Sequence, residues 1–388
     1  MEKIVTTTRM VFMVLGALDR AVFRNRFGLG NEFVKGLNSV GPLILGMAGI
    51  MCSAPVVGRL LLKLVTPLFS TIGADPSIIA GTCFGLDMGG YYMTASMTDD
   101  PAAIMLGGVI LSTVLGATIA FTIPVALTLC RPEDAPAVSR GIVFGIISIP
   151  FGTIAAAMFS GLTLRYTLIN AAPAFVLAAL LAGGMIFFPQ KTLIIFRAFG
   201  NLLQAFIILA LAAAGVEATL GITVIPGMDP LADQLEIISM IGITLAGAYP
   251  FVHVLSRILS PVLNMIARLM GVNGPSVTGM LACLANPLPM YDMIALMDER
   301  GKVLAMAFCT CANAMIGDHF AFISIAYPEG TVAMFVVKIV SAAVALFIAA
   351  LAIKVILHIP WVVLHFLIDG MDGLGTPFHV ELQSCFFQ

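Results

Sequence analysis

The segment Ser77–Met97, SIIAGTCFGLDMGGYYMTASM, has the length of a membrane-spanning helix but carries an acidic residue and two adjacent glycines near its centre. A transmembrane helix needs about 20 mainly apolar residues. Asp87 is closely followed by Gly89 and Gly90, and neighbouring glycines weaken a helix and favour a break in it. The segment therefore predicts a membrane helix interrupted at mid-depth, with a carboxylate and unpaired backbone carbonyls beside the interruption.

The composition of the whole chain places such helices in lipid. Of its 388 residues, 60% are hydrophobic and only 10% are charged, and the mean hydropathy is +1.06. Soluble proteins carry about 25% charged residues. In lipid the backbone must satisfy its own hydrogen bonds in helices or a closed barrel, and the apolar runs here are continuous rather than alternating. We therefore predict an all-α polytopic membrane protein, and the net charge of −2 argues against a nucleic-acid partner.

About eleven segments are long and apolar enough to be transmembrane helices. They are Ile4–Phe23, Leu37–Leu62, Ser77–Met97, Ala102–Cys130, Gly141–Leu162, Ile169–Phe188, Ala198–Ile222, Ile237–Leu259, Val277–Met297, Val303–Tyr327 and Val332–Phe366. Lys and Arg in short loops mark the cytoplasmic side of a membrane. We therefore expect the loop around Arg24 and the loop with Lys191 and Arg197 in the cytoplasm, and the acidic loop around Asp229 outside.

Two halves of the chain resemble each other at a spacing of about 200 residues, as in many secondary transporters. The matching positions, first half then second, are Pro76-Ser77 and Pro275-Ser276, Asp87 and Asn286, and Gly116 and Gly317. We divide the chain into a first membrane repeat (1–165), a connecting span and loop (166–197), a second membrane repeat (198–368) and a poorly ordered tail (369–388). The loops after the first and seventh spans carry opposite charge, which favours an inverted repeat.

Two further places put polar groups at membrane depth. In the run Asn286-Pro287-Leu288-Pro289, the two prolines must break the ninth span and free backbone carbonyls, while Asn286 offers both a donor and an acceptor. Asp318 and His319 are adjacent in the tenth span and could relay protons or hold a solute. Adjacent residues do not share a helix face, so we do not expect a direct Asp–His dyad. The structural alternatives are proline kinks without special purpose and a polar pair that ties two helices together.

These places define the candidate solute site. Tyr91 and Tyr92 offer aromatic faces, which attract ammonium groups, and Tyr249 lies beside a proline. The alternative for the first break is a helix-packing notch in which its carboxylate bonds a neighbouring helix. We expect no metal and no cofactor. The predicted substrate-binding residues are Asp87, Gly89, Gly90, Tyr91, Tyr92, Tyr249, Asn286, Asp318 and His319.

The sequence resembles the bacterial ethanolamine-utilisation permease family, the EutH type. The stretches that carry the resemblance are Gly73–Tyr92 (GADPSIIAGTCFGLDMGGYY), Gly247–Val252 (GAYPFV), Leu284–Phe320 (LANPLPMYDMIALMDERGKVLAMAFCTCANAMIGDHF), Ala17–Arg20 (ALDR) and Ile225–Pro230 (IPGMDP). The resemblance covers about Met1 to Lys354. It implies a multi-pass protein of the cytoplasmic membrane that admits ethanolamine as a carbon and nitrogen source, but it does not assign binding residues.

The physical chemistry of ethanolamine suits this site. The molecule is mostly protonated at neutral pH, so it crosses lipid poorly and needs a carboxylate, carbonyls or aromatic rings for its ammonium group. Asp87, the carbonyls freed beside Asn286 and the pair Tyr91 and Tyr92 could supply these, and Asn286 could bind the hydroxyl.

Other functions remain open at this level. One alternative is an ion- or proton-coupled transporter of another small polar solute, and another is an intramembrane enzyme that uses Asp318 and His319. A passive sensor subunit is a further alternative. The sequence leaves the coupling ion, the number of crossings, and the formation of a homo-oligomer undecided.

Overall fold

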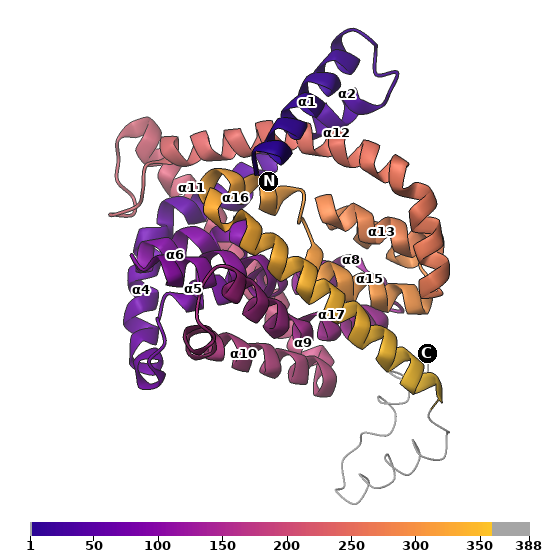
Figure 1. Ribbon diagram of the computed structural model, residues 1–388. Coiled ribbons are helices and arrows are strands. Elements are labelled where there is room, and N and C mark those ends of the chain that lie inside the picture. The colour runs from indigo at the N-terminus through magenta and orange to yellow at the C-terminus, as the bar shows by residue number, and fades with distance from the viewer. Residues whose placement is uncertain (1, 359–388) are drawn as a thin grey trace, which may run out of the picture.

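The structure, a computed structural model, describes residues 2–358, which form helices and connecting loops without a strand (Figure 1). Met1 and residues 359–388 lie outside the described part, and so does the side chain of Asp87. The all-α class is confirmed for the part of the chain that is described. The predicted tail, 369–388, and the end of the second repeat, 359–368, lie outside it.

The first half of the chain contains several π-helical segments, labelled η, between its α-helices. In chain order the elements are α1 (Glu2–Ala21), α2 (Leu29–Asn38), α3 (Val40–Leu43), η1 (Ile44–Ala48), α4 (Gly49–Ile72), α5 (Ile78–Cys83), η2 (Leu86–Gly90), α6 (Tyr91–Met97), α7 (Pro101–Ala103), η3 (Ile104–Gly116), η4 (Thr118–Thr122), α8 (Ile123–Leu129) and α9 (Ala135–Phe159).

The second half consists mainly of α-helices, with two short 3₁₀ turns. Its elements are α10 (Leu164–Phe187), α11 (Pro189–Leu220), α12 (Leu231–Met270), α13 (Gly274–Ala285), α14 (Leu288–Met293), η5 (Ile294–Leu296), α15 (Glu299–Ala312), α16 (Asp318–Ala326), η6 (Pro328–Gly330) and α17 (Thr331–His358). Helix α12 has 40 residues, far more than the span predicted over Ile237–Leu259.

Seven helical runs among the described residues are long and apolar enough to cross a membrane. They are Leu29–Ile72, Pro101–Leu129, Ala135–Phe159, Leu164–Phe187, Pro189–Leu220, Leu231–Val254 and Pro328–Ile353. The predicted spans at Ser77–Met97, Val277–Met297 and Val303–Tyr327 are each divided into shorter helices. The protein is therefore a multi-pass membrane protein, while a total of about eleven crossings stays a prediction.

The two predicted halves contain the same succession of elements around Ser77 and Ser276. In each, a short helix ends in extended backbone, a second short helix follows, and an aspartate then caps the next helix: Asp100 accepts from the N–H of Ala102, and Asp298 from that of Gly301. This succession supports two structural repeats. Their relative orientation, and with it the inverted repeat and the boundaries at 165 and 197, stays a prediction.

Helix α9 lies at the centre of the main core, against α10, α15 and α17. Three of its glycines allow this close packing, because a Cβ on Gly141 or Gly145 would press on α15 and one on Gly152 would overlap with α17. The apolar cluster around α9 also includes much of η3, so this core joins both halves of the chain.

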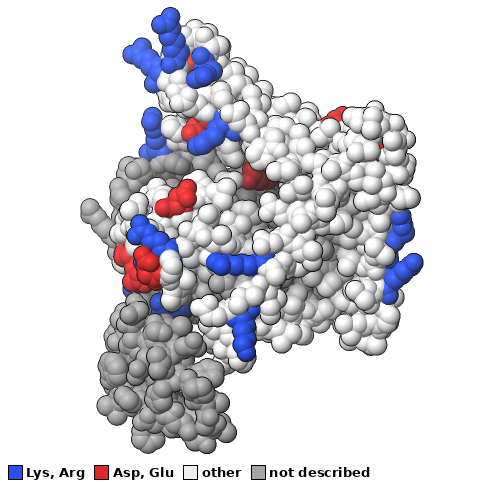
Figure 2. Space-filling view, turned by 180° about the vertical axis from the view of Figure 1, so that it is seen from behind, with Lys and Arg blue, Asp and Glu red and all other residues white. Residues whose placement is uncertain are grey.

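Helices α1 and α2 form a hairpin that projects from the body of the molecule beside α12 (Figure 1). Buried Asp19 closes the hairpin loop by accepting hydrogen bonds from the backbone N–H groups of Phe27 (3.1 Å) and Gly30 (2.9 Å). Arg20 instead donates to Asn31, so the two adjacent residues have separate partners. Figure 2 shows charged side chains mainly at the top, left and right of the visible face, with a few near its middle and broad uncharged areas between them, as expected of a lipid-facing protein.

Candidate functional site

The first helix break lies where the sequence predicted it. The backbone is extended at Phe84 and Gly85, and Met88 and Gly89 have non-helical dihedral angles. Gly89 has φ +92°, a conformation that residues with a Cβ rarely adopt, and a Cβ there would meet the side chain of Ile50 at 2.7 Å. Both geometry and packing therefore require glycine at this position.

The second break is centred on Asn286, whose backbone is extended between α13 and α14. The side chain turns this break into a rigid corner, because its Oδ1 accepts the N–H of Leu288 at 2.9 Å. The carbonyls of Cys283 and Leu284 accept the N–H groups of Ala314 (2.7 Å) and Ile316 (2.8 Å). Two of the carbonyls that we expected to be available to a solute beside Asn286 are thus already bonded within the protein.

A third break separates α15 from α16, where the sequence predicted one continuous span. Asn313 leaves the helical conformation with φ −52° and ψ 143°, Ala314 has φ +51°, and Asp318 is the first residue of α16. Gly317 packs so closely on the carbonyl of Ala285 that a Cβ would overlap with it. The loop between α15 and α16 is held at the second break, because the N–H groups of Ala314 and Ile316 bond the carbonyls of Cys283 and Leu284 there.

Three of the predicted site residues meet at these breaks. Asn286 Nδ2 donates to Asp318 Oδ2 at 3.1 Å. Tyr249 of α12 lies close enough to interact with both side chains. We call Tyr249, Asn286 and Asp318 the polar cluster. All three side chains are only partly buried, so part of each stays open to a small molecule.

Two further predicted residues form an aromatic cluster with α16. The ring of Tyr91 lies 5.3 Å from that of Tyr92 and 5.7 Å from that of Tyr327, and the ring of Tyr92 lies 5.7 Å from that of Phe322. The Tyr91 hydroxyl donates to the carbonyl of Ala326 at 3.2 Å. These rings therefore join the broken helix in the first half of the chain to α16 in the second half.

Helix α16 brings the polar and aromatic clusters together. Asp318 and Phe322 are four residues apart and lie on one face of this helix. The same helix packs against η2, which contains Gly89, Gly90 and the backbone of Asp87. His319 is buried, and its position next to Asp318 in the helix directs it to a different face. The Asp87 side chain lies outside the described atoms, so its role stays a prediction.

Two buried cations were not among the predicted site residues. Arg9 of α1 donates to the carbonyl of Ile316 at 3.2 Å, and its guanidinium lies 3.5 Å from the centre of the Phe320 ring. Lys338 of α17 is completely buried and donates to three oxygens. In the sequence, both positions are basic residues inside predicted apolar spans, Ile4–Phe23 and Val332–Phe366, and charge inside a bilayer is costly and usually functional.

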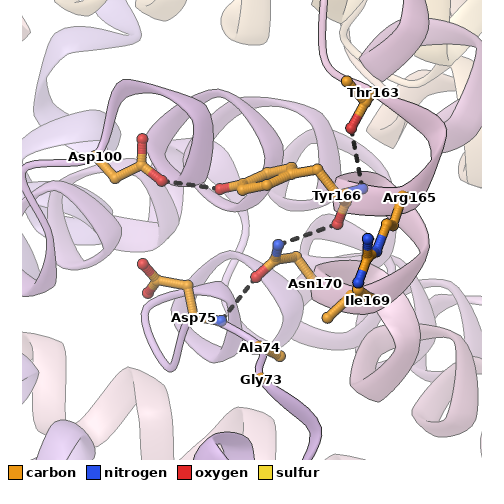
Figure 3. A pocket seen from close by; sticks show the side chains of 9 residues that line it. All are labelled: Gly73, Ala74, Asp75, Asp100, Thr163, Arg165, Tyr166, Ile169 and Asn170. Carbon is orange, nitrogen blue, oxygen red and sulfur yellow. Dashed lines mark hydrogen bonds between the residues drawn. The ribbon is translucent and has the colours of Figure 1, made fainter.

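Two cavities lie near the first repeat. One, of about 530 Å³, extends between η1, α8 and α11, with Met88 of the first break in its wall and Arg197, Asn201 and Gln204 among its polar lining residues. The other, of about 510 Å³, is open and lies beside the start of α10 (Figure 3).

The open cavity is a polar depression separate from the two clusters. Tyr166 donates its hydroxyl to Asp100 Oδ2 at 3.0 Å, and Asn170 Oδ1 accepts the N–H of Asp75 at 2.7 Å (Figure 3). None of the predicted substrate-binding residues lines it.

A multi-pass bundle in which broken helices carry polar and aromatic groups to a shared place has the architecture typical of a membrane transport protein. The chain belongs to the EutH family of ethanolamine utilisation proteins, whose family model matches residues 1–352. This finding confirms the resemblance seen in the sequence motifs.

Relatives at moderate identity cover most of the chain. It is 36% identical over 321 residues to the probable ethanolamine permease EutH of Listeria monocytogenes serotype 1/2a (strain 10403S), covering 83% of this chain and 86% of that protein. It is 36% identical over 358 residues to the probable ethanolamine permease EutH of Salmonella typhimurium (strain LT2), covering 83% and 88%. The uncharacterized protein YxeR of Bacillus subtilis (strain 168) is 33% identical over 328 residues, covering 84% and 88%. No solved structure matches the chain.

Proposed function

We propose that this protein is a permease that imports ethanolamine across the cytoplasmic membrane. The relatives named probable ethanolamine permeases supply the solute, and their alignments cover most of the chain. The observation that carries the proposal is the hydrogen bond between Asn286 and Asp318, which places a partly buried carboxylate at a helix break inside the bundle.

The polar cluster suits the two ends of ethanolamine. The carboxylate of Asp318 would accept the ammonium group, and the negative charge would offset the cost of moving a cation into a low-dielectric interior. Asn286 and Tyr249 carry groups that can bond the hydroxyl. The rings of Tyr91 and Tyr92 contact Phe322 on the α16 face that also carries Asp318, and they can stabilise an ammonium group through their π-systems.

The first helix break would complete the site. The segment η2, which contains Gly89 and Gly90, packs against α16, and Asp87 in the same segment remains a candidate second carboxylate. The cavity that reaches Met88 offers a route by which the imported solute could leave this break toward the Arg197 end, which we expect in the cytoplasm. In such a protein, alternating access would arise from movement of the two repeats around the shared site.

The alternative of an intramembrane enzyme that uses Asp318 and His319 is less well supported. The relatives are named permeases, and Asp318 bonds Asn286 in this structure. The other alternative, coupled transport of a different small polar solute, differs from our proposal in substrate and in ion dependence. It predicts that ethanolamine is not itself carried.

Uptake of labelled ethanolamine into proteoliposomes tests the proposal directly. Purified protein should accelerate entry over protein-free vesicles, and excess unlabelled ethanolamine should suppress it. The accumulated label should be recovered as unchanged ethanolamine. No acceleration with correctly folded protein would refute the solute assignment, and recovery of a converted product would favour an enzyme.

A further inference from the structure

Lys338 is a charged residue that is completely buried. Its side chain has 0% exposure, in the middle of the apolar helix α17. The ammonium donates to the carbonyl of Thr113 at 2.8 Å, to the carbonyl of Asn313 at 2.8 Å and to Asn313 Oδ1 at 3.1 Å. These three acceptors are neutral oxygens, two of which belong to the backbone.

Two of the oxygens belong to Asn313 at an interrupted helix end, and the third belongs to a π-helical segment. Asn313 caps the C-terminal end of α15 at the third break, where the helix dipole is negative. Thr113 belongs to the π-helical segment η3 of the first repeat. The ammonium therefore joins the two repeats, and its acceptors form a small oxygen cage at a broken helix.

The cage is held in place by a buried polar network. Asn313 Nδ2 donates to Thr122 Oγ1 at 3.1 Å, and Thr122 is also in contact with Tyr291 of α14. These contacts fix the orientation of the Asn313 amide, so that its oxygen faces Lys338. The cage is thus preorganised by residues from both halves of the chain.

Unwound carbonyls and the C-terminal ends of half-helices are the groups that hold coupling cations such as Na⁺ in secondary transporters. The ammonium of a lysine carries the same charge as Na⁺ and can bind the same kinds of oxygen, but it is covalently attached and cannot dissociate from the protein. We propose that Lys338 is a resident cation, which takes the place of a coupling Na⁺ at the third helix break. This inference rests on the proposed transport function and adds that transport is independent of Na⁺.

The solute site is distinct from this cage in chemistry. The Lys338 ammonium occupies the cage and leaves no room there for the ammonium group of a solute. The polar cluster presents the carboxylate of Asp318. Lys338 therefore acts as a positioning residue, which holds the third break in the arrangement that places Asp318.

The test compares ethanolamine uptake into proteoliposomes in Na⁺ medium and in K⁺ medium of equal ionic strength. Wild-type protein should show rates that agree within about twofold in the two media. Lys338→Met should lose at least tenfold in K⁺ medium, and Na⁺ should restore at least threefold, because a small cation can enter the vacated cage. Lys63→Met removes an exposed lysine and should behave as wild type.

Several results would overturn the inference. Na⁺-dependent uptake by the wild type would show that a mobile ion is needed. A folded Lys338→Met variant that transports at the wild-type rate, or that is equally inactive in both media, would show that Lys338 is dispensable or merely a structural strut.

If Lys338→Met does not fold, Asn313→Ala removes one cage oxygen and keeps the lysine. This variant should lose at least threefold in both media, and an unchanged rate would also overturn the inference. Absence of wild-type uptake in either medium would instead count against the ethanolamine permease itself.

Discussion

The Asp318→Asn substitution separates charge from shape at the polar cluster. The two side chains have nearly the same size, and the amide oxygen of the variant can still accept the hydrogen bond that Asn286 Nδ2 now donates at 3.1 Å. The variant therefore keeps the contact between the second break and α16 but loses the negative charge. We expect it to fold and to bind the cation weakly.

The size of the effect follows from the lost charge. A hydrogen bond to a charged group contributes about 1.5–3 kcal/mol. Two unit charges at about 4 Å interact by about 4 kcal/mol at an effective dielectric constant of ~20, which is an upper limit for a partly open site. We therefore expect the KM for ethanolamine to rise by about 10- to 100-fold, since each 1.4 kcal/mol is a factor of about ten.

The assay is the concentration dependence of initial uptake into proteoliposomes. Asp292→Asn is the matched control, because Asp292 is an exposed carboxylate on the neighbouring helix α14. Its KM should equal that of the wild type, and both variants should elute as folded protein. An unchanged KM in folded Asp318→Asn would remove Asp318 from the solute site and would direct the search to Asp87.

Three other substitutions test separate parts of the structure. Gly317→Ala should destabilise the protein by about 1–3 kcal/mol, because the backbone of Ala285 leaves no room for a Cβ. Gly41→Ala is the control, since a Cβ there meets open space. The melting temperature in detergent should fall for the first variant only, and equal melting temperatures would contradict the close packing. Tyr91→Phe removes one hydrogen bond worth about 1 kcal/mol and should reduce the uptake rate severalfold with the fold intact; full activity would exclude a role for the hydroxyl. Lys302→Met removes the ammonium that lies 2.6 Å from buried Asp134, so it should lower the free energy of unfolding by about 3–5 kcal/mol. The fraction of the variant that folds should keep the wild-type KM for ethanolamine. A raised KM would mean that this ion pair also shapes the solute site.

The first two helix breaks could be predicted because their causes are local. Gly89 and Gly90 weaken the helix in which they lie, and Pro287 and Pro289 cannot donate the hydrogen bonds that an unbroken helix requires. The structure confirms both interruptions. The third break was missed because it contains no proline.

That third break depends on hydrogen bonds between distant segments. The N–H groups of Ala314 and Ile316 bond the carbonyls of Cys283 and Leu284, which are free only because the second helix is broken. The sequence of the tenth span alone does not reveal these hydrogen bonds to the second break. The same bonds also explain why the second break offers a solute fewer carbonyls than its prolines suggest.

Several residues of the candidate site lie close together in the structure, while their role in binding stays a prediction. Tyr249, Asn286 and Asp318 meet, and Tyr91 and Tyr92 of α6 contact α16, the helix that begins with Asp318. Their pairing could not be read from the sequence, since it depends on the direction in which each half-helix leaves its break. Lys338 was missed because a lone lysine among apolar residues does not indicate which oxygens it will reach.

The sequence by itself determined the solvent, the helical class, the positions of the proline and glycine breaks, and the family. Each of these follows from composition, from local backbone chemistry or from collinear motifs, and needs no knowledge of packing. Only the tertiary structure decided that Asp318 bonds Asn286, that the tyrosines of one repeat lie on α16 of the other, and that Lys338 closes an oxygen cage between them. The physical reason is that a hydrogen bond or ring contact requires a distance of a few ångströms, and residues 25 or more positions apart reach it only when the intervening helices pack in one particular way.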